Sequence, residues 1–410
     1  MHARDALVLG ALFVLSAGTV YGLSGDSGPS GIGLDAQALE PPPGGGLVQE
    51  TEGTLSILFL GDTHPGDNFR NGLPDDILSH REAGYAFGNF RTLLEDAGVV
   101  LLDLESPTIA PPPEAQRRRE QQYWTDVTRT PELLRGLGVS AVSLANDHVL
   151  DFGVEGLEQT LDTLGGIGIA VLGAGADEER ATRPFRVERA VGGQTFHMAV
   201  LAATMNRPRR HRGGQEGPQV RRLDPAQMAA QIAELKAADP ELFVVAYPHW
   251  GQSYRWASKG QRDTAHQLID AGADLIVGHG SHMLQEIEQY KKRWILYGLG
   301  NFVFTSAGQY GRRRGAVPYG LVARLQVREA DGRLAKTLRV YPIHTDNLAN
   351  EFAGRFAGAK DLGEVHWNLI WKAHRYDSKL KRHLVVRVDR FGHHFELPLH
   401  SAPKGRAKTP

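Results

Sequence analysis

The chain has 410 residues, of which 41% are hydrophobic and 23% are charged, and these proportions are ordinary for a globular protein with a sizeable core. The formal net charge of −1 gives no overall field that attracts nucleic acid, so charged partners must be sought through local clusters. There is no cysteine, which excludes disulfides, thiolate metal sites and cysteine nucleophiles.

The first 23 residues predict a targeting element. Residues 6–23 carry no charge, and this length lies between a long signal-peptide core and a spanning helix. Both a membrane anchor and a cleaved signal peptide fit, and we favour an uncleaved anchor. Residues 24–50 are rich in Gly, Pro and Ser, a composition typical of a linker that does not fold on its own. We therefore expect the protein to be membrane-anchored or secreted, facing the periplasm or the cell exterior.

From residue 55 onward, short apolar runs alternate with helical stretches, and this alternation predicts α/β layers around a largely buried sheet. We expect strands at residues 55–60, 99–105, 141–145, 243–247, 275–278 and 294–297, and helices at residues 87–97, 131–137, 154–164, 225–238 and 260–271.

After about residue 320 the pattern changes to strands and turns. Strands are expected at residues 321–327, 338–343, 384–388 and 394–397. We divide the chain after the linker into a main domain, residues 51–345, and a C-terminal extension with strands, residues 346–410. This β-rich region either completes a second sheet or forms a docking surface.

Polar side chains that bind metals follow almost every apolar run of the main domain. They are Asp62 and His64, then Asp103 and Glu105, then Asn146, Asp147 and His148, then His249, and finally His279 and His282. In open α/β sheets, ligands collect beyond the carboxyl ends of the strands. Carboxylate, amide and imidazole groups together suit a divalent metal such as zinc, manganese or iron. One such residue is more often a turn or capping residue, but five elements on successive strand exits favour a metal centre.

The order of these residues resembles the ligand order of the calcineurin-like metallophosphoesterases. More closely, residues 143–153 resemble the SLANNHxLDxG motif of the poly-γ-glutamate capsule (CapA-type) family, and residues 103–107 resemble its NLE segment. The HWGxEY, GHxPHxxQxxE and YSLGNFVF motifs have counterparts at residues 249–254, 278–288 and 297–304. The resemblance covers residues 55 to about 304, and it implies a four-layer α/β/β/α metallophosphoesterase-like sandwich with a β-rich C-terminal completion.

The resemblance also implies two divalent metal ions and their ligands. One ion would be held by Asp62, His64 and His282, and the second by His249, His279 and either Asp147 or Asn146. Glu105 would bridge the two, with Asp103 as the alternative. Two such cations about 3.5–4 Å apart stabilise charge on a phosphoryl or carbonyl oxygen and activate a water molecule.

Further residues receive roles around this centre. His148 would be the general acid or would steady the leaving oxygen. Asp151 would orient His148, although an N-cap for the helix that follows is an equal alternative. We expect Trp250, Tyr254 and Asn301 to contact the substrate, while aromatic residues after a strand are more often core packing.

The chain departs from the family pattern at three positions. Asp147 stands where the phosphoesterase pattern has Asn, Gly280 stands where many members carry the first loop histidine, and Ser253 replaces the acidic residue of HWGxEY. An additional carboxylate at position 147 would strengthen the binding of a hard metal. The serine weakens any acid–base role at position 253.

Three arginine-rich stretches, at residues 117–119, 207–212 and 312–314, are expected in loops. They either form a solvated face or bind an anionic polymer or phosphate through guanidinium groups near the metal centre. We expect no nucleic-acid binding, because no aromatic stacking pattern or binding motif accompanies them.

These observations favour a metal-dependent extracytoplasmic hydrolase-like protein that acts in the synthesis, anchoring or processing of an anionic capsule polymer such as poly-γ-glutamate. Other membrane proteins of capsule synthesis would be its partners. Two alternatives stay open: a general dinuclear-metal phosphoesterase acting on an extracytoplasmic phosphate ester, and a non-catalytic scaffold subunit of a capsule-synthesis complex.

Overall fold

The computed structural model describes residues 53–66, 84–113, 122–206, 217–305, 308–373, 380 and 384–399. The expected membrane segment, the linker and the arginine-rich stretches at 117–119 and 207–212 lie outside the described residues. Within the described ranges, no helix is both long enough and apolar enough to cross a membrane.

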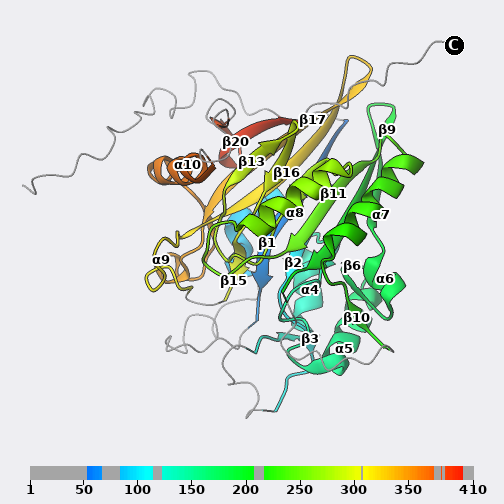
Figure 1. The fold of residues 1–410 in the computed structure, drawn as a ribbon. Coiled ribbons are helices and arrows are strands. Elements are labelled where there is room, and N and C mark those ends of the chain that lie inside the picture. The colour runs from blue at the N-terminus through cyan, green and yellow to red at the C-terminus, as the bar shows by residue number, and fades with distance from the viewer. Residues whose placement is uncertain are drawn as a thin grey trace, which may run out of the picture.

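Two β-sheets form the centre of the molecule (Figure 1). The first sheet has the order β19-β20-β17-β16-β1-β2-β5-β6, and the second has the order β13-β14-β12-β11-β9-β8. The first comprises β1 (Thr54–His64), β2 (Val99–Leu104), β5 (Ala141–Ser143), β6 (Ala170–Leu172), β16 (Tyr319–Ala330), β17 (Arg333–His344), β19 (Val385–Asp389) and β20 (Gly392–Leu399), with β15 (Asn301–Phe304) paired to β1 and β18 (Arg355–Phe356) paired to β17. The second comprises β8 (Phe185–Val191), β9 (Gln194–Thr204), β11 (Phe243–His249), β12 (Leu275–Val277), β13 (Ile287–Tyr290) and β14 (Arg293–Leu296).

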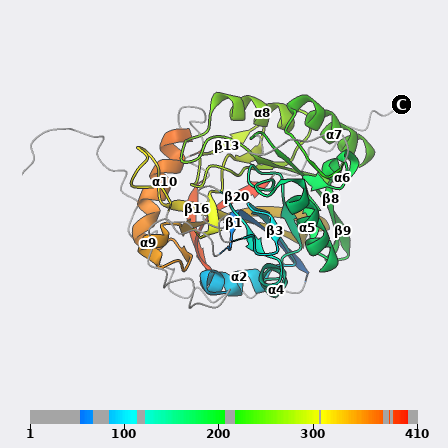
Figure 2. The same ribbon diagram turned by 90° about the horizontal axis from the view of Figure 1, so that it is seen from below.

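Helices cover the outer faces of both sheets. Figure 2 shows α7 and α8 on one side and α2 and α4 on the other, with the strands between them. The helices are α2 (Arg91–Glu95), α4 (Arg129–Gly136), α5 (Gly153–Gly166), α6 (Glu178–Thr182), α7 (Pro225–Ala238), α8 (Lys259–Asp270), α9 (Asn347–Asn350) and α10 (Ala359–Ala373). Two short pairs, β3 (Thr108–Ile109) with β4 (Thr125–Asp126) and β7 (Ala174–Gly175) with β10 (Gln219–Val220), complete the described strands.

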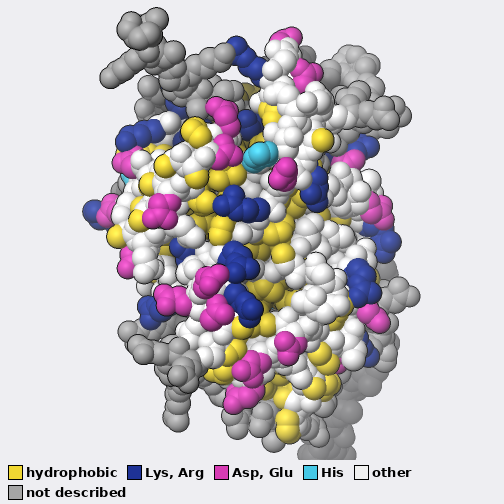
Figure 3. All heavy atoms as spheres, turned by 90° about the vertical axis from the view of Figure 1, so that its right-hand side faces the viewer, with side chains coloured by type: hydrophobic (Ala, Val, Ile, Leu, Met, Phe, Trp, Pro, Cys, Tyr) yellow, Lys and Arg dark blue, Asp and Glu magenta, His cyan; other side chains and the backbone are white. Residues whose placement is uncertain are grey.

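The alternation of side chains along β1 explains the layers. Ile57 and Phe59 point into the core between the two sheets, whereas Leu58 and Leu60 pack in the core beneath the helices of the first sheet. Met228 and other residues of α7 and α8 form a third core on the outer face of the second sheet. This arrangement confirms the predicted α/β/β/α sandwich. On the side where α6 and α7 lie, hydrophobic side chains are interspersed with charged ones (Figure 3).

The strands predicted for the main domain are present, and so are four of its five predicted helices. The predicted helix at residues 87–97 is a 3-10 turn, η2 (Tyr85–Phe90), followed by the short α2, since Gly88 and Asn89 are poor helix formers. The β8–β9 hairpin was not predicted. The edge strand β8 places charged residues at exposed positions, which weakens its apolar signal.

The C-terminal strands complete the sheet that contains β1, because β20 pairs with β17 and β19 pairs with β20. Of the two roles considered for this region, the structure therefore favours the completion of a sheet. Helix α10, which was not predicted, places Val365 and Leu369 in the core between the sheets, which also contains Phe395 of β20. The β-rich completion of the fold is confirmed.

Candidate metal centre

The carboxyl ends of strands from both sheets converge at one edge of the sandwich. Within the first sheet, Asp62 is in register with Asp103 of β2 and with Asn301 of β15. Within the second sheet, a parallel bridge joins His249 to His279. This convergence brings carboxylates from the first sheet against histidines from the second.

Asp62 joins β1 to the loop that follows β12. Its carboxylate accepts hydrogen bonds from the backbone N–H of Gly280, at 3.0 and 3.2 Å, and from that of His282, at 3.2 Å. Burial disfavours its charged form, but His279, His282 and His249 outweigh this effect and lower the pKa of Asp62 to about 2. A charged Asp62 therefore fixes the histidine-bearing loop.

His249 lies between two carboxylates. Its Nδ1 is 3.0 Å from Oδ2 of Asp103, and its Nε2 is 3.1 Å from Oδ1 of Asp147. Burial lowers the pKa of His249, but the two carboxylates outweigh burial and raise it well above its ordinary value. The pKa of Asp147 is lowered, because the hydrogen bond and charge of His249 outweigh burial. Asp103 thus orients His249 so that Nε2 faces the centre, an arrangement common to metal-binding histidines.

Glu105 is buried at the centre of the group. Neither of its carboxylate oxygens has a hydrogen-bond partner among the described residues, and Oε1 lies 3.6 Å from Nε2 of His282 and 3.8 Å from Nε2 of His148. Burial raises the pKa of Glu105 well above its ordinary value, and the charges of Asp62 and Asp147 raise it further. Buried carboxylate oxygens without partners are costly unless a cation satisfies them, so Glu105 fits a metal ligand.

Three groups of side chains could each hold a metal ion, with ligand atoms within 4.8 Å of one another. They are Asp62 with Glu105 and His282, Glu105 with Asp147 and His148, and Asp62 with Asp103 and His249. Glu105 belongs to two of these groups, which favours it over Asp103 as the residue shared by two ions. Oxygen and imidazole donors in these proportions suit zinc, manganese or iron.

Two predicted ligands lie at the margin of these groups. Both ring nitrogens of His279 are buried without a hydrogen bond of ordinary geometry to a described residue, and Nδ1 is 3.5 Å from Asp62. His64, at the end of β1, belongs to none of the three groups and stacks on Tyr123, with ring centroids 4.9 Å apart. Its backbone position two residues after Asp62 keeps it next to the centre.

Between Asn146 and Asp147, the geometry favours Asp147 as the ligand. The amide of Asn146 donates to the carbonyl of Leu104 at 2.8 Å, and its oxygen accepts from the backbone N–H of His148 and Val149. These bonds fix the loop after β5, and they occupy the side chain that would otherwise reach an ion.

His148 is held by Asp151. Nδ1 of His148 is 2.8 Å from Oδ2 of Asp151, while Nε2 faces the carboxylates of Glu105 and Asp147 at 3.8 and 3.9 Å. The residue that precedes α5 is Phe152, and no side chain caps that helix. Of the two roles considered for Asp151, the geometry therefore favours orienting His148.

The three residues expected at the substrate occupy different environments. Trp250 is fully buried in the core beneath α7 and α8, and its Nε1 donates to the carbonyl of Tyr297 at 2.7 Å, so its assignment to substrate contact is wrong. Tyr254 packs beside His282, with ring centroids 5.6 Å apart. Oδ1 of Asn301 is 2.9 Å from Nδ1 of His282, so Asn301 orients that histidine.

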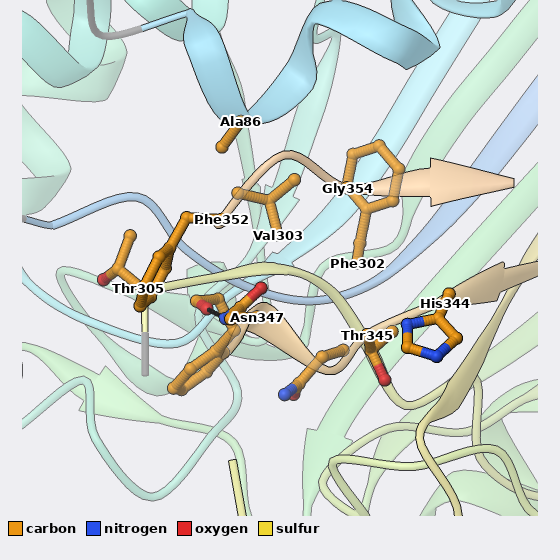
Figure 4. A pocket seen from close by; sticks show the side chains of 11 residues that line it. Ala86, Phe302, Val303, Thr305, His344, Thr345, Asn347, Phe352 and Gly354 are labelled. Atoms are coloured by element: carbon orange, nitrogen blue, oxygen red, sulfur yellow. Dashed lines mark hydrogen bonds between the residues drawn. The ribbon is translucent and has the colours of Figure 1, made fainter. Parts of the chain in front are cut away.

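A small pocket lies beside the centre and is formed by β15 and the segment around residues 344–354 (Figure 4). Phe302, Val303, Thr345 and His344 are among its lining residues. Asn301 is the only residue lining this pocket that was also predicted as a site residue. The pocket therefore adjoins the metal centre but is not part of it.

Sequence reasoning missed two tyrosines that touch the site. The ring of Tyr123 lies 3.9 Å from that of His148, and the hydroxyl of Tyr310 donates to the backbone carbonyl of His282 at 3.2 Å. Neither belongs to a metal-ligand pattern. Both tyrosines lie in loops, where no periodic alternation of apolar and polar residues indicates which side chains are buried.

Comparison with known proteins gives a consistent family match. Residues 56–306 match the family model described as bacterial capsule synthesis protein PGA_cap. The chain is 29% identical to the PGA biosynthesis protein CapA of Bacillus subtilis, over 66% of this chain and 69% of that protein. It is 32% identical to a probable polyglutamine synthesis accessory protein of Mycobacterium tuberculosis, over 64% of this chain and 71% of that protein.

Among solved structures, the chain is similar to the calcineurin-like phosphoesterase YfkN from Bacillus subtilis. The TM-score is 0.42 and the sequence identity 16%, over 81% of this chain and 100% of that one.

We predict that Gly280→Ala damages the centre, because position 280 has φ +91° and a Cβ there would lie 2.8 Å from Nε2 of His249. The free energy of unfolding should fall by about 1–3 kcal/mol, measured by urea denaturation. Gly311→Ala is the matched control, since a Cβ at Gly311 meets no atom within 4 Å. Equal stability of the two variants would contradict the close packing described for this loop.

We also predict that metal binding releases protons. Because the pKa values of Glu105 and His249 are both raised above their ordinary values, each group keeps its proton to a higher pH than usual, and a bound cation displaces that proton. Isothermal titration of the metal-stripped full-length protein with zinc, in buffers of different ionisation enthalpy, measures this release. Glu105→Gln should release about one proton fewer. An unchanged proton count in this variant would contradict the protonated state of Glu105.

Proposed function

Because the chain belongs to the bacterial capsule synthesis protein PGA_cap family, we propose that it is a metal-dependent hydrolase-like protein that acts on an anionic capsule polymer. The polymer would be of the poly-γ-glutamate kind, and the action would be its synthesis, anchoring or processing outside the cytoplasm. The names of the relatives, which refer to PGA biosynthesis and polyglutamine synthesis, support the choice of polymer.

The observation that carries this proposal is the environment of Glu105. A purely structural carboxylate in a protein core is paired or hydrogen-bonded, but both oxygens of Glu105 lack a hydrogen-bond partner among the described residues. Around it stand the ionised carboxylates of Asp62 and Asp147 and the imidazoles of His282 and His148. So dense a set of buried ligand groups is costly for stability and is typical of a functional site.

We assign the following roles to the residues of the site. Asp62, Glu105, Asp147, His249, His279 and His282 would hold the cations, with His64 beside them. When bound, two divalent cations supply Lewis-acid stabilisation of charge that develops on the scissile group. His148, held by Asp151 with Nε2 toward the centre, would donate a proton to the leaving group.

Basic side chains on two loops next to His282 support an anionic substrate. The loop that carries Arg312, Arg313 and Arg314 is tied to His282 through the hydroxyl of Tyr310, and all three arginines are exposed. Arg255 is exposed on the neighbouring loop, which is joined to the arginine loop by a 3.1 Å hydrogen bond from Trp256 to the carbonyl of Gly315. We name Arg255 and Arg312–Arg314 the arginine rim. Nε of Arg313 donates to Oε1 of Gln309 at 3.1 Å, and the exposed guanidinium groups of the rim keep further N–H donors for a polyanion.

The uncharged N-terminal run supports a location at the outer face of the membrane, either anchored or secreted. Such a location would place the metal centre next to an exported polymer and to the membrane proteins that synthesise it.

We predict that the full-length protein loaded with manganese or zinc shortens γ-linked polyglutamate, as measured by size-exclusion chromatography. Glu105→Gln and His148→Asn should each lower the rate at least about 100-fold, because one removes a ligand charge and the other the proton donor. Exposed positions provide matched controls, Glu132→Gln and His197→Asn, which should retain the parent rate.

The same preparations are tested on a phosphodiester, bis(p-nitrophenyl) phosphate. Hydrolysis of the ester without any change in the polymer would contradict the polymer proposal and favour a general phosphoesterase. Intact polymer and intact ester with metal bound would contradict hydrolysis and favour a scaffold subunit.

We predict that Arg312→Ser/Arg313→Ser/Arg314→Ser raises the half-saturating concentration of polyglutamate about tenfold at low salt, since each exposed ion pair contributes a fraction of a kcal/mol. The difference should shrink as salt is added. The control with the same charge change is Arg186→Ser/Arg189→Ser/Arg333→Ser, at exposed positions of β8 and β17. Equal effects of the two triple variants would show that only net charge matters and would contradict the arginine rim.

A further inference from the structure

The segment before β4 approaches the candidate metal centre closely and was not assigned a role by any motif. Thr125 of β4 donates its backbone N–H to the carbonyl of Pro107 at 2.9 Å, and its hydroxyl is 3.0 Å from that of Thr108. Pro107 and Thr108 lie just after Glu105 in the chain. These contacts fasten residues 122–126 to the stretch that emerges from β2 with the central carboxylate.

This segment binds Asp151 at two points. The backbone N–H of Tyr123 donates to Oδ2 of Asp151 at 2.7 Å, and the side-chain amide of Gln122 donates to the carbonyl of Asp151 at 2.8 Å. Oδ2 is the same oxygen that lies 2.8 Å from Nδ1 of His148. The position of the Asp151 carboxylate, and so the hydrogen bond to His148, depends on where residue 123 is held.

The ring of Tyr123 lies between two histidines of the centre. Its centroid is 3.9 Å from that of His148 and 4.9 Å from that of His64, and Phe304 supports it edge-on at 5.5 Å. Phe304 also packs against His282 at 5.1 Å. A planar ring in this place limits the rotation of the imidazole of His148 about χ2, which a flexible aliphatic side chain would limit less.

We propose that Tyr123 is a positioning residue, which fixes the imidazole of His148 with Nε2 toward the metal centre through its ring contact and its backbone bond to Asp151. This inference rests on the proposed role of His148 as proton donor. With Nδ1–H directed to Asp151, Nε2 is the nitrogen left to exchange a proton with a leaving group. Within the side chain of Tyr123, we assign the positioning role to the aromatic ring and not to the hydroxyl.

Substitution at position 123 separates the ring from the hydroxyl. In the full-length, metal-loaded protein, Tyr123→Leu should lower kcat on bis(p-nitrophenyl) phosphate or polyglutamate about 10–100-fold, with KM and metal content unchanged. Tyr123→Phe, which keeps the ring, should restore kcat to within about threefold of the parent. Tyr290→Leu is the matched control, because it removes a tyrosine ring that stacks at 3.8 Å on His266, a histidine outside the centre.

A double-mutant cycle with His148 tests whether the effect passes through that residue. In the His148→Asn background, Tyr123→Leu should cause no further loss of kcat. If Tyr123→Leu instead acted through a general loss of stability, kcat of the double variant would fall below that of His148→Asn alone. Thermal unfolding of each variant shows whether it is folded. If Tyr123→Leu does not fold, Tyr123→Met serves in its place.

Nuclear magnetic resonance gives a readout that needs no catalysis. In zinc-loaded full-length protein labelled with ¹⁵N-histidine, the Nδ1–H signal of His148, assigned by its loss in His148→Asn, should persist in Tyr123→Phe and disappear in Tyr123→Leu. If the NMR signal behaves in this way but the protein hydrolyses neither substrate, the proposed function is contradicted and the positioning role of Tyr123 stands. A retained signal and kcat in Tyr123→Leu, or additive losses in the cycle, would overturn the inference.

Discussion

The structure depends on one costly interaction, the burial of four carboxylates among histidines at a single edge of the sandwich. Asp62 and Asp103 come from adjacent strands of the first sheet, and His249 and His282 from the second. Asp62 and Asp103 have their histidine partners on the second sheet, so the two sheets must end at the same level. Tyr247 of β11 joins the sheets near this edge, because its hydroxyl donates to the carbonyl of Leu60 at 3.0 Å.

The local chain geometry follows from this constraint. The loop after β12 must bring two histidines to Asp62 while passing close to His249, and a glycine with positive φ at position 280 makes that approach possible. Polar side chains one step outside the centre then fix the imidazoles: Asp103 holds His249, Asp151 holds His148 and Asn301 holds His282. These hydrogen bonds hold the histidines toward the centre, which lowers the cost of ordering them when a cation binds.

Most of the layer architecture and the order of the site residues could be predicted from the sequence. Apolar runs followed by Asp, Glu or His at the strand exits identify buried strands and the edge where ligands meet. The direction of a side chain in a loop could not be predicted, which is why Trp250 was placed at the substrate although it lies in the core. Tyr123 was missed for the same reason: its contacts join segments that are distant in sequence, and no spacing pattern encodes them. The choice between Asn146 and Asp147 required the hydrogen bonds of the folded loop.

Metal stoichiometry tests the central claim most directly. The full-length protein and its Glu105→Gln variant would be reconstituted with zinc and with manganese, dialysed and analysed by plasma mass spectrometry, with Glu132→Gln as the control at an exposed position. We expect about two equivalents of metal in the parent and the control, and a clear loss in Glu105→Gln, because that carboxylate is shared by two groups of ligands. No bound metal in the folded parent after reconstitution would contradict a metal centre and the hydrolase-like function built on it.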